Sequence, residues 1–212
     1  MILENYYWFW KGVLSDKFCD DVIKTGLQQK PDIAITGDYN NKKKLNKKNL
    51  KDLKKIRHSN TVFLDKNWIF RAVHEFVSKA NQNAKWNFQY DFTESCQFTI
   101  YKKTQHYTWH ADAFPKPYSE DHQFKGYRGK IRKLSCVIQL SDPSTYEGGE
   151  LEFDFRNHTK DNIKDIHTCK AFNTTRGSII VFPSFIYHRV MPVTKGTRYS
   201  LVSWTLGKPY VW

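Results

Sequence analysis

The sequence predicts an α+β fold in which helices of the first third pack on one sheet of a β-sandwich or barrel. Two observations predict it. Apolar residues before Trp86 recur at helical spacing, whereas the chain after Trp86 is divided into many short β-rich runs by Gly, Pro and Asp. At 212 residues and 40% hydrophobic content, the chain is long and apolar enough for a substantial core. We expect one domain over 1–212, with a mainly helical part, 1–85, and a β-rich core, 86–212.

The first helix is predicted to follow a polar cap, either Ser15 or Asp16. An apolar stripe through Val22 and Leu27 gives it one buried face, and Pro31 ends it.

The rest of the first third contains a loop, a strand and a second long helix. The stretch 36–58 is polar and rich in Lys, which predicts a loop with a short helix. Thr61–Leu64 is β-branched and apolar, as in a strand. From Asn67 to Ala84 the apolar residues return at helical spacing.

The β-rich part is predicted to contain nine strands. Each is a short apolar or alternating run bounded by turn-forming residues. The predicted strands are Phe88–Tyr90, Glu94–Lys102, Tyr107–His110, Lys133–Leu140, Glu150–Phe155, Ala171–Phe172, Ser178–Phe182, Tyr187–Pro192 and Ser200–Leu206. Between them, Gly148 and Gly149 predict a tight turn or bulge, because Gly tolerates positive φ.

The chain is strongly basic, with 34 Lys and Arg against 21 Asp and Glu and a net charge of +13. Much of this charge lies between Lys42 and Lys55. A basic surface binds nucleic acid or an acidic protein, although a run of Lys is also common in solvated loops. A further hypothesis is that the segment closes over the active site when substrate binds.

Several classes of protein are disfavoured by composition. No apolar run is long enough to span a membrane, and the first residues lack the features of a signal peptide, so we expect a cytoplasmic protein. The four cysteines are scattered with no Cys-x-x-Cys pair, which disfavours zinc-ribbon and redox motifs. Nothing in the sequence indicates the oligomeric state.

Three residues suggest a metal site. His110 and Asp112 are two positions apart, so on a strand both side chains point to one side. His188 lies far downstream, after a run that predicts a strand, a Pro-containing turn and a second strand. Two imidazoles and one carboxylate with open coordination positions are the ligand set of non-haem Fe(II) oxygenases.

Arg198 follows His188 by ten residues. A guanidinium is a forked cation that binds a carboxylate through two hydrogen bonds, as an acidic co-substrate beside iron requires. Ser200 is two positions further along the same predicted strand, so both side chains can reach one carboxylate.

In combination these motifs resemble the prolyl 4-hydroxylase-type Fe(II)/2-oxoglutarate dioxygenases, and among them the small microbial and phage PKHD-type hydroxylases. The resemblance covers about residues 94–206. It rests on Tyr101, Tyr107, His110 and Asp112, on the run Tyr-Glu-Gly-Gly-Glu-Leu at 146–151, and on Pro183, His188, Pro192, Gly196 and Arg198.

The resemblance implies a double-stranded β-helix, the cupin-like jelly roll, and an oxidoreductase. Fe(II) would be bound by His110, Asp112 and His188. Arg198 would pair with 2-oxoglutarate, assisted by Tyr101 and Ser200. The other requirements are O₂ and, as a candidate accessory reductant, ascorbate. The activity implied is hydroxylation of a peptide or protein residue, with proline the first candidate.

Substrate contacts are expected around the metal ligands and in the loop after Asp112. The stretch 113–129 does not have a strand pattern, and a loop at this place can act as a substrate lid. The candidate contacts are Trp109, Tyr118, Tyr127 and Arg128, with Trp204 and Tyr187 as further aromatic residues beside ligand positions.

Two alternatives to peptide hydroxylation stay open. The same chemistry could oxidise a nucleic acid, a free amino acid or another small molecule, and the net charge favours the nucleic acid. A jelly roll can also be a non-catalytic module that binds a metal, but such a module has no use for Arg198 and an open coordination site.

Overall fold

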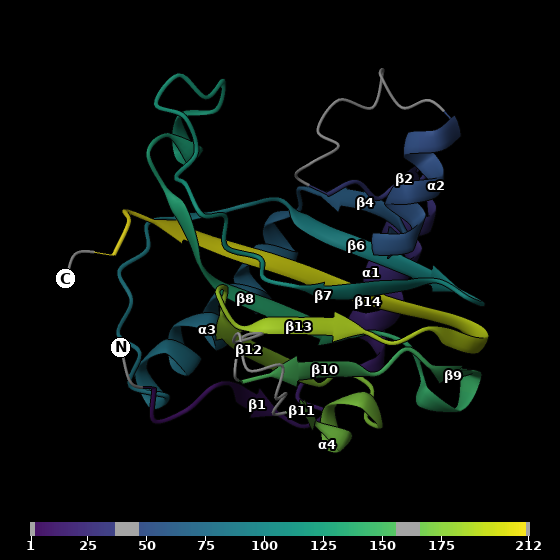
Figure 1. Cartoon of the computed structure of the whole chain (residues 1–212). Helices are drawn as coiled ribbons and strands as arrows, with labels where there is room; N and C mark the ends of the chain where they lie inside the picture. The colour runs from purple at the N-terminus through teal and green to yellow at the C-terminus, as the bar shows by residue number, and fades with distance from the viewer. Residues whose placement is uncertain (1–2, 37–46, 156–165, 211–212) are drawn as a thin grey trace.

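Two antiparallel sheets form a sandwich in the computed structural model, which describes residues 3–36, 47–155 and 166–210 (Figure 1). The larger sheet has the order β1-β12-β8-β14-β6-β4-β2, with β5 and β9 paired to β14. Its strands are β1 (Trp8–Trp10), β2 (Asp32–Ile33), β4 (Asn60–Leu64), β5 (Phe92–Thr93), β6 (Cys96–Lys102), β8 (Ile131–Gln139), β9 (Tyr146–Gly148), β12 (Ile179–Pro183) and β14 (Val193–Gly207).

The smaller sheet has the order β11-β10-β13-β7-β3. Its strands are β3 (Arg57–His58), β7 (His106–His110), β10 (Leu151–Asp154), β11 (Ile166–Thr168) and β13 (Tyr187–Val190). A buried cluster that includes Phe153, Ile180 and Phe182 joins the inner faces of the two sheets. This arrangement agrees with the predicted α+β jelly roll.

Helices α1 (Asp16–Leu27) and α3 (Asn67–Asn83) pack against the larger sheet, as predicted for one sheet of the sandwich. Cys19, Val22 and Val73 lie in a second apolar cluster with residues of β6 and β8. The Ser15 side chain accepts a hydrogen bond from the Phe18 amide, so Ser15 rather than Asp16 is the cap of α1.

The Lys-rich stretch contains the predicted short helix, α2 (Lys47–Ile56), whereas 37–46, including Lys42, lie outside the described residues. Helix α2 contacts β3 and β7 of the smaller sheet, so the helices of the first third cover both sheets. This part also contributes β1, β2, β3 and β4. Strands β1, β3 and β4 pair directly with β12, β7 and β6 of the β-rich core, and β2 pairs with β4.

The predicted strand Phe88–Tyr90 is wrong. Asn87 has a φ of 51°, and the amide and carbonyl of Phe88 both bond to the side chain of Asn81 on α3. Because that side chain satisfies the Phe88 backbone, no strand partner is needed, and pairing begins only at β5.

The predicted strand Ala171–Phe172 is also wrong, because these residues lie in the short helix α4 (Lys170–Asn173). The carbonyl of Cys169 accepts from the amides of Phe172 and Asn173. Phe172 is still fully buried in the core between the sheets, and burial is the property that the apolar pattern detected.

Two connections between strands contain little regular structure. The loop after Asp112 has only η3 (Lys125–Tyr127), and the turn before β9 has η4 (Pro143–Thr145). Among the described residues, no helix has the length and apolar character needed to span a membrane.

Close packing of α1 on β6 generates a stability prediction. A Cβ on Gly26 would lie 2.3 Å from the Phe98 ring, which is fully buried. Gly26→Ala should therefore destabilise the fold by about 1–3 kcal/mol through overpacking, although Ala favours helix formation. Urea unfolding measures the effect, with exposed Lys24→Ala on the same helix as a near-neutral control. Equal or greater stability of Gly26→Ala would contradict this packing.

Candidate metal centre

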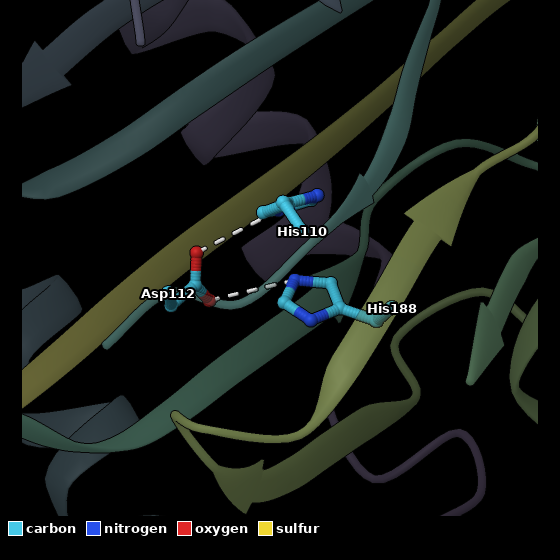
Figure 2. Close-up of side chains that lie close together, drawn as sticks. All are labelled: His110, Asp112 and His188. Carbon is cyan, nitrogen blue, oxygen red and sulfur yellow. Dashed lines mark ion pairs between the residues drawn. The ribbon is translucent and has the colours of Figure 1, made fainter. Parts of the chain in front are cut away.

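His110, Asp112 and His188 meet between the two sheets (Figure 2). One ligand atom from each lies within 4.8 Å of the other two. The Nε2 atom of His110 is 3.7 Å from Asp112 Oδ1, and that of His188 is 3.5 Å from Asp112 Oδ2. The triad therefore presents two nitrogens and a carboxylate toward a common point.

The two histidines are neighbours because β7 and β13 pair antiparallel with His188 opposite His110. Asp112 departs from the sequence-based expectation, since β7 ends at His110 and Asp112 lies in a bend. The Asp112 amide donates to the carbonyl of Ser184, in the turn before β13. A hydrogen bond to the neighbouring turn thus places the carboxylate, rather than alternation along one strand.

Backbone carbonyls fix the imidazole orientations. His110 Nδ1 is 2.8 Å from the Thr108 carbonyl oxygen, and His188 Nδ1 is 2.9 Å from the Ile186 carbonyl oxygen. A carbonyl only accepts, so each Nδ1 carries the hydrogen and each Nε2 keeps its lone pair. Such outer hydrogen bonds are typical of metal-binding histidines.

The protonation states suit a cation as well. Burial, together with the nearby His188, holds the pKa of His110 well below its usual range, so this imidazole is neutral. Burial raises the pKa of Asp112, but His188, His110 and Arg132 outweigh it and lower this pKa to about 2. A neutral imidazole and an ionised carboxylate are ready for a divalent ion.

A serine hydrogen-bonds the Asp112 carboxylate, and a second serine contacts the first. Ser135 Oγ on β8 donates to Asp112 Oδ2 at 2.7 Å, and Ser184 Oγ is 2.9 Å from Ser135 Oγ. Both serines are fully buried. Sequence reasoning missed them, because nothing in a strand sequence marks which serine will face a ligand 23 positions away.

Arg198 on β14 is 1% exposed, and its three side-chain nitrogens have no hydrogen-bond partner among the described residues. A buried guanidinium without an acceptor is costly unless a ligand satisfies it. Arg198 lines the same pocket of about 690 Å³ as the triad. The pocket therefore contains an unmatched fork for an anion beside the metal ligands.

The residues expected to assist Arg198 are its neighbours. Tyr101 pairs with Arg198 across β6 and β14, and its ring centroid is 5.8 Å from the Arg198 guanidinium carbon. Ser200 is buried and also lines the pocket. Gly149 has a φ of 69°, and a Cβ there would lie 2.9 Å from the Arg198 side chain. The predicted glycine turn thus also leaves room for Arg198.

A second buried arginine borders the pocket and was missed by sequence reasoning. Arg132 forms two 2.7 Å hydrogen bonds with Glu94, and its guanidinium carbon is 3.9 Å from the Trp204 ring centroid. Trp204 lines the pocket as expected. A charged residue at the start of an apolar strand, as Arg132 is in β8, was the available signal.

The candidate substrate contacts separate into two groups. Tyr118 lines the pocket, and its hydroxyl donates to Glu94. Trp109, Tyr127 and Arg128 do not line it. Trp109 has the Arg189 guanidinium over its ring, Tyr127 borders a separate hollow beside α3, and Arg128 donates to the His122 carbonyl. Tyr187, on β13, is likewise outside the pocket lining.

Comparison with known proteins gives one family match. The family described as the 2OG-Fe(II) oxygenase superfamily matches residues 96–206. A PKHD-type hydroxylase of Xylella fastidiosa (strain M12) is 33% identical over 110 residues, which are 51% of this chain and 42% of that protein. The chain spans about two fifths of the length of the curated relatives it matches. These relatives are bacterial and give no support to a phage origin.

Two solved structures share the fold. A Pseudomonas putida prolyl-4-hydroxylase has a TM-score of 0.64 at 18% identity, covering 95% of this chain and 93% of that one. A prolyl hydroxylase from Trichoplax adhaerens, in complex with a hypoxia inducible factor peptide fragment, has a TM-score of 0.60 at 14% identity, covering 95% and 84%.

Loss of the Ser135 hydroxyl should weaken metal binding. Ser135→Ala removes the hydrogen bond that orients Asp112, and outer hydrogen bonds of this kind are worth about tenfold or more in metal affinity. Anaerobic titration with Fe(II) measures the change. Ser178→Ala, which removes a buried serine that accepts from the Gly12 amide, is the matched control. Unchanged Fe(II) affinity in Ser135→Ala would remove this serine from the site.

Arg198→Met should stabilise the ligand-free protein by about 1 kcal/mol or more, because it removes a buried charge without an acceptor. The same variant should lose the stabilisation that 2-oxoglutarate confers on the iron-loaded wild type. Thermal unfolding with and without the co-substrate checks both parts. A less stable variant that still responds to 2-oxoglutarate would show that the guanidinium has another partner.

Proposed function

The chain belongs to the 2OG-Fe(II) oxygenase superfamily, and from that premise we propose that it hydroxylates prolyl residues of a peptide or protein. The single observation that carries the proposal is the buried Arg198, which no described residue hydrogen-bonds, in one pocket with the metal triad. A metal site alone fits many functions. A metal site beside an unmatched guanidinium fits a metal that shares its site with a carboxylate co-substrate.

The residues present fit both cofactors of the family, Fe(II) and 2-oxoglutarate. His110, Asp112 and His188 supply three ligands of the types that Fe(II) oxygenases use, and leave positions for the co-substrate and O₂. When bound, iron supplies the oxidising chemistry by which O₂ and 2-oxoglutarate yield succinate, CO₂ and one oxygen atom for the substrate C–H bond.

The chain's own part in this reaction is binding, orientation and exclusion of water. The Arg198 guanidinium binds the far carboxylate of 2-oxoglutarate, and Tyr101 and Ser200 border the same space. Arg198 and Ser200 both lie on β14, a central strand between β6 and β8. The carboxylate of 2-oxoglutarate therefore binds at a rigid position. The surrounding apolar core keeps this end of the pocket dry.

A proline ring suits the open end of the pocket. Its walls include the aromatic rings of Tyr107 and Trp204, and Phe114 and Tyr118 of the loop after Asp112 border it. Aromatic faces pack well on a saturated ring. The names of the relatives, PKHD-type hydroxylase and prolyl-4-hydroxylase, favour the same substrate class, and the Trichoplax protein was solved with a peptide.

Succinate formation tests the proposal. Purified protein with Fe(II), ascorbate, O₂ and 2-oxoglutarate should release succinate, and peptides that contain proline should raise the rate above the uncoupled background. His110→Ala should reduce it about 100-fold or more, since a triad with one ligand missing loses the metal. His106→Ala, which changes a half-buried histidine on the same strand that does not line the pocket, is the control. If succinate forms but peptides neither raise its rate nor yield hydroxyproline, the prolyl substrate class is disproved and the oxygenase activity still stands.

Oxidation of a nucleic acid is the second candidate, favoured by the net charge of +13. Phosphate contacts release counterions, so such binding would weaken steeply between low and high salt. Oxidised nucleobases in place of hydroxyproline, with salt-sensitive binding, would favour this candidate. No succinate and no 2-oxoglutarate binding would instead favour a non-catalytic metal-binding module.

A further inference from the structure

Arg57 is a buried cation in the metal pocket that the reaction described above does not use. It lies on β3, opposite Tyr107 of β7, and its side chain lines the pocket. It is 7% exposed. In the described part of the chain no carboxylate forms an ion pair with it, which sets it apart from Arg132 and its partner Glu94.

The Arg57 side chain is held in place before any ligand arrives. Its Nε donates to Ser59 Oγ at 3.2 Å, and its guanidinium carbon lies 4.6 Å from the Tyr107 ring centroid. Tyr107 also stacks on His110, and the two ring centroids are 3.4 Å apart. Arg57 therefore lies in the pocket of the metal ligands, and within the described residues its bond to Ser59 leaves the two terminal nitrogens of its fork for a ligand.

The charges of the pocket leave Arg57 unmatched even when both cofactors are bound. Among the pocket-lining residues that the structure describes, Asp112 is the only carboxylate, against the cations Arg57, Lys116, Arg132 and Arg198. Fe(II) and Arg198 together balance 2-oxoglutarate and Asp112, and Glu94 balances Arg132. The positive charge that remains in the pocket lies on Arg57 and Lys116.

We propose that Arg57 receives a carboxylate of the substrate close to the carbon that is hydroxylated, so that the chain selects acidic substrates. The carboxylate has two possible sources, an Asp or Glu side chain beside the target residue or the α-carboxylate of a C-terminal target residue. Both offer a planar pair of oxygens to a stacked guanidinium fork. The inference rests on the proposed function, since it names the peptides that this site accepts.

Two pairs of short peptides test it. In the first pair a central proline is flanked on both sides by Glu or by Gln, with both termini capped. In the second pair the proline is C-terminal, with a free carboxylate or a carboxamide. For each peptide we would measure kcat/KM for hydroxyproline formation, and the Kd for protein loaded with Fe(II) and 2-oxoglutarate without O₂.

Wild type should favour the acidic member of one pair by about tenfold or more, the usual worth of a hydrogen-bonded charge. The pair that shows the preference identifies the source of the carboxylate. In Arg57→Met the ratio should fall to about one, and in Arg57→Lys it should be intermediate, because Lys keeps the charge without the fork. Lys51→Met, on the exposed face of α2, should keep the wild-type ratio.

The ratio of the values for the acidic and the neutral peptide of a pair distinguishes substrate recognition by Arg57 from a structural role. If Arg57 only supports Tyr107 and His110, its variants will weaken both members of each pair equally, and the proposal is overturned. The same holds if wild type shows no preference or binds none of the peptides. If peptides bind but none is hydroxylated, the proposed function fails, and the Kd ratio still decides on Arg57.

Discussion

The candidate site depends first on the pairing of β13 with β7. That ladder places His188 opposite His110, although 77 residues lie between them in the chain. The same turn that leads into β13 offers the Ser184 carbonyl to the Asp112 amide, so one connection positions two of the three ligands. A shift of one residue in this register would turn His188 to the opposite face of the sheet. The core between the sheets, with Phe153 and Phe182 beside His188, opposes such a shift.

Charge then determines what the pocket can accept. The larger sheet contributes Arg198 and Arg132, and the smaller sheet contributes the triad histidines and Arg57. Each arginine is held differently. Glu94 pairs with Arg132, Tyr107 stacks on Arg57, and Arg198 has no acceptor among the described residues. Burying such charges costs free energy, and a bound anion would offset part of that cost. The proposed substrate and co-substrate would therefore stabilise the fold as well as react in it.

The residues that the sequence predicted as metal ligands lie together, in one pocket with Arg198. They could be selected because few residue types can bind a metal or a carboxylate, and their order along the chain was characteristic. It also predicted the helices with strong periodicity, α1 and α3. It failed where tertiary contacts override local pattern, as at Phe88, whose backbone is bonded by Asn81, and at Phe172, which is buried in a helix. Strands that are distant in the sequence bring Ser135, Arg132 and Arg57 to the site. Arg57 lies in the stretch 36–58, for which the sequence predicted a polar loop with a short helix. Only the pairing of β3 with β7 brings it there.

We propose that 2-oxoglutarate contacts both Arg198 and the Fe(II) that the triad binds. Calorimetric titration of 2-oxoglutarate without O₂, into metal-free and Fe(II)-loaded protein, tests this claim most directly. A shared site requires coupling, so iron should tighten 2-oxoglutarate binding by about tenfold or more, and 2-oxoglutarate should tighten iron binding by the same factor. Equal 2-oxoglutarate affinity with and without iron would contradict the account, because the two groups would then bind independently.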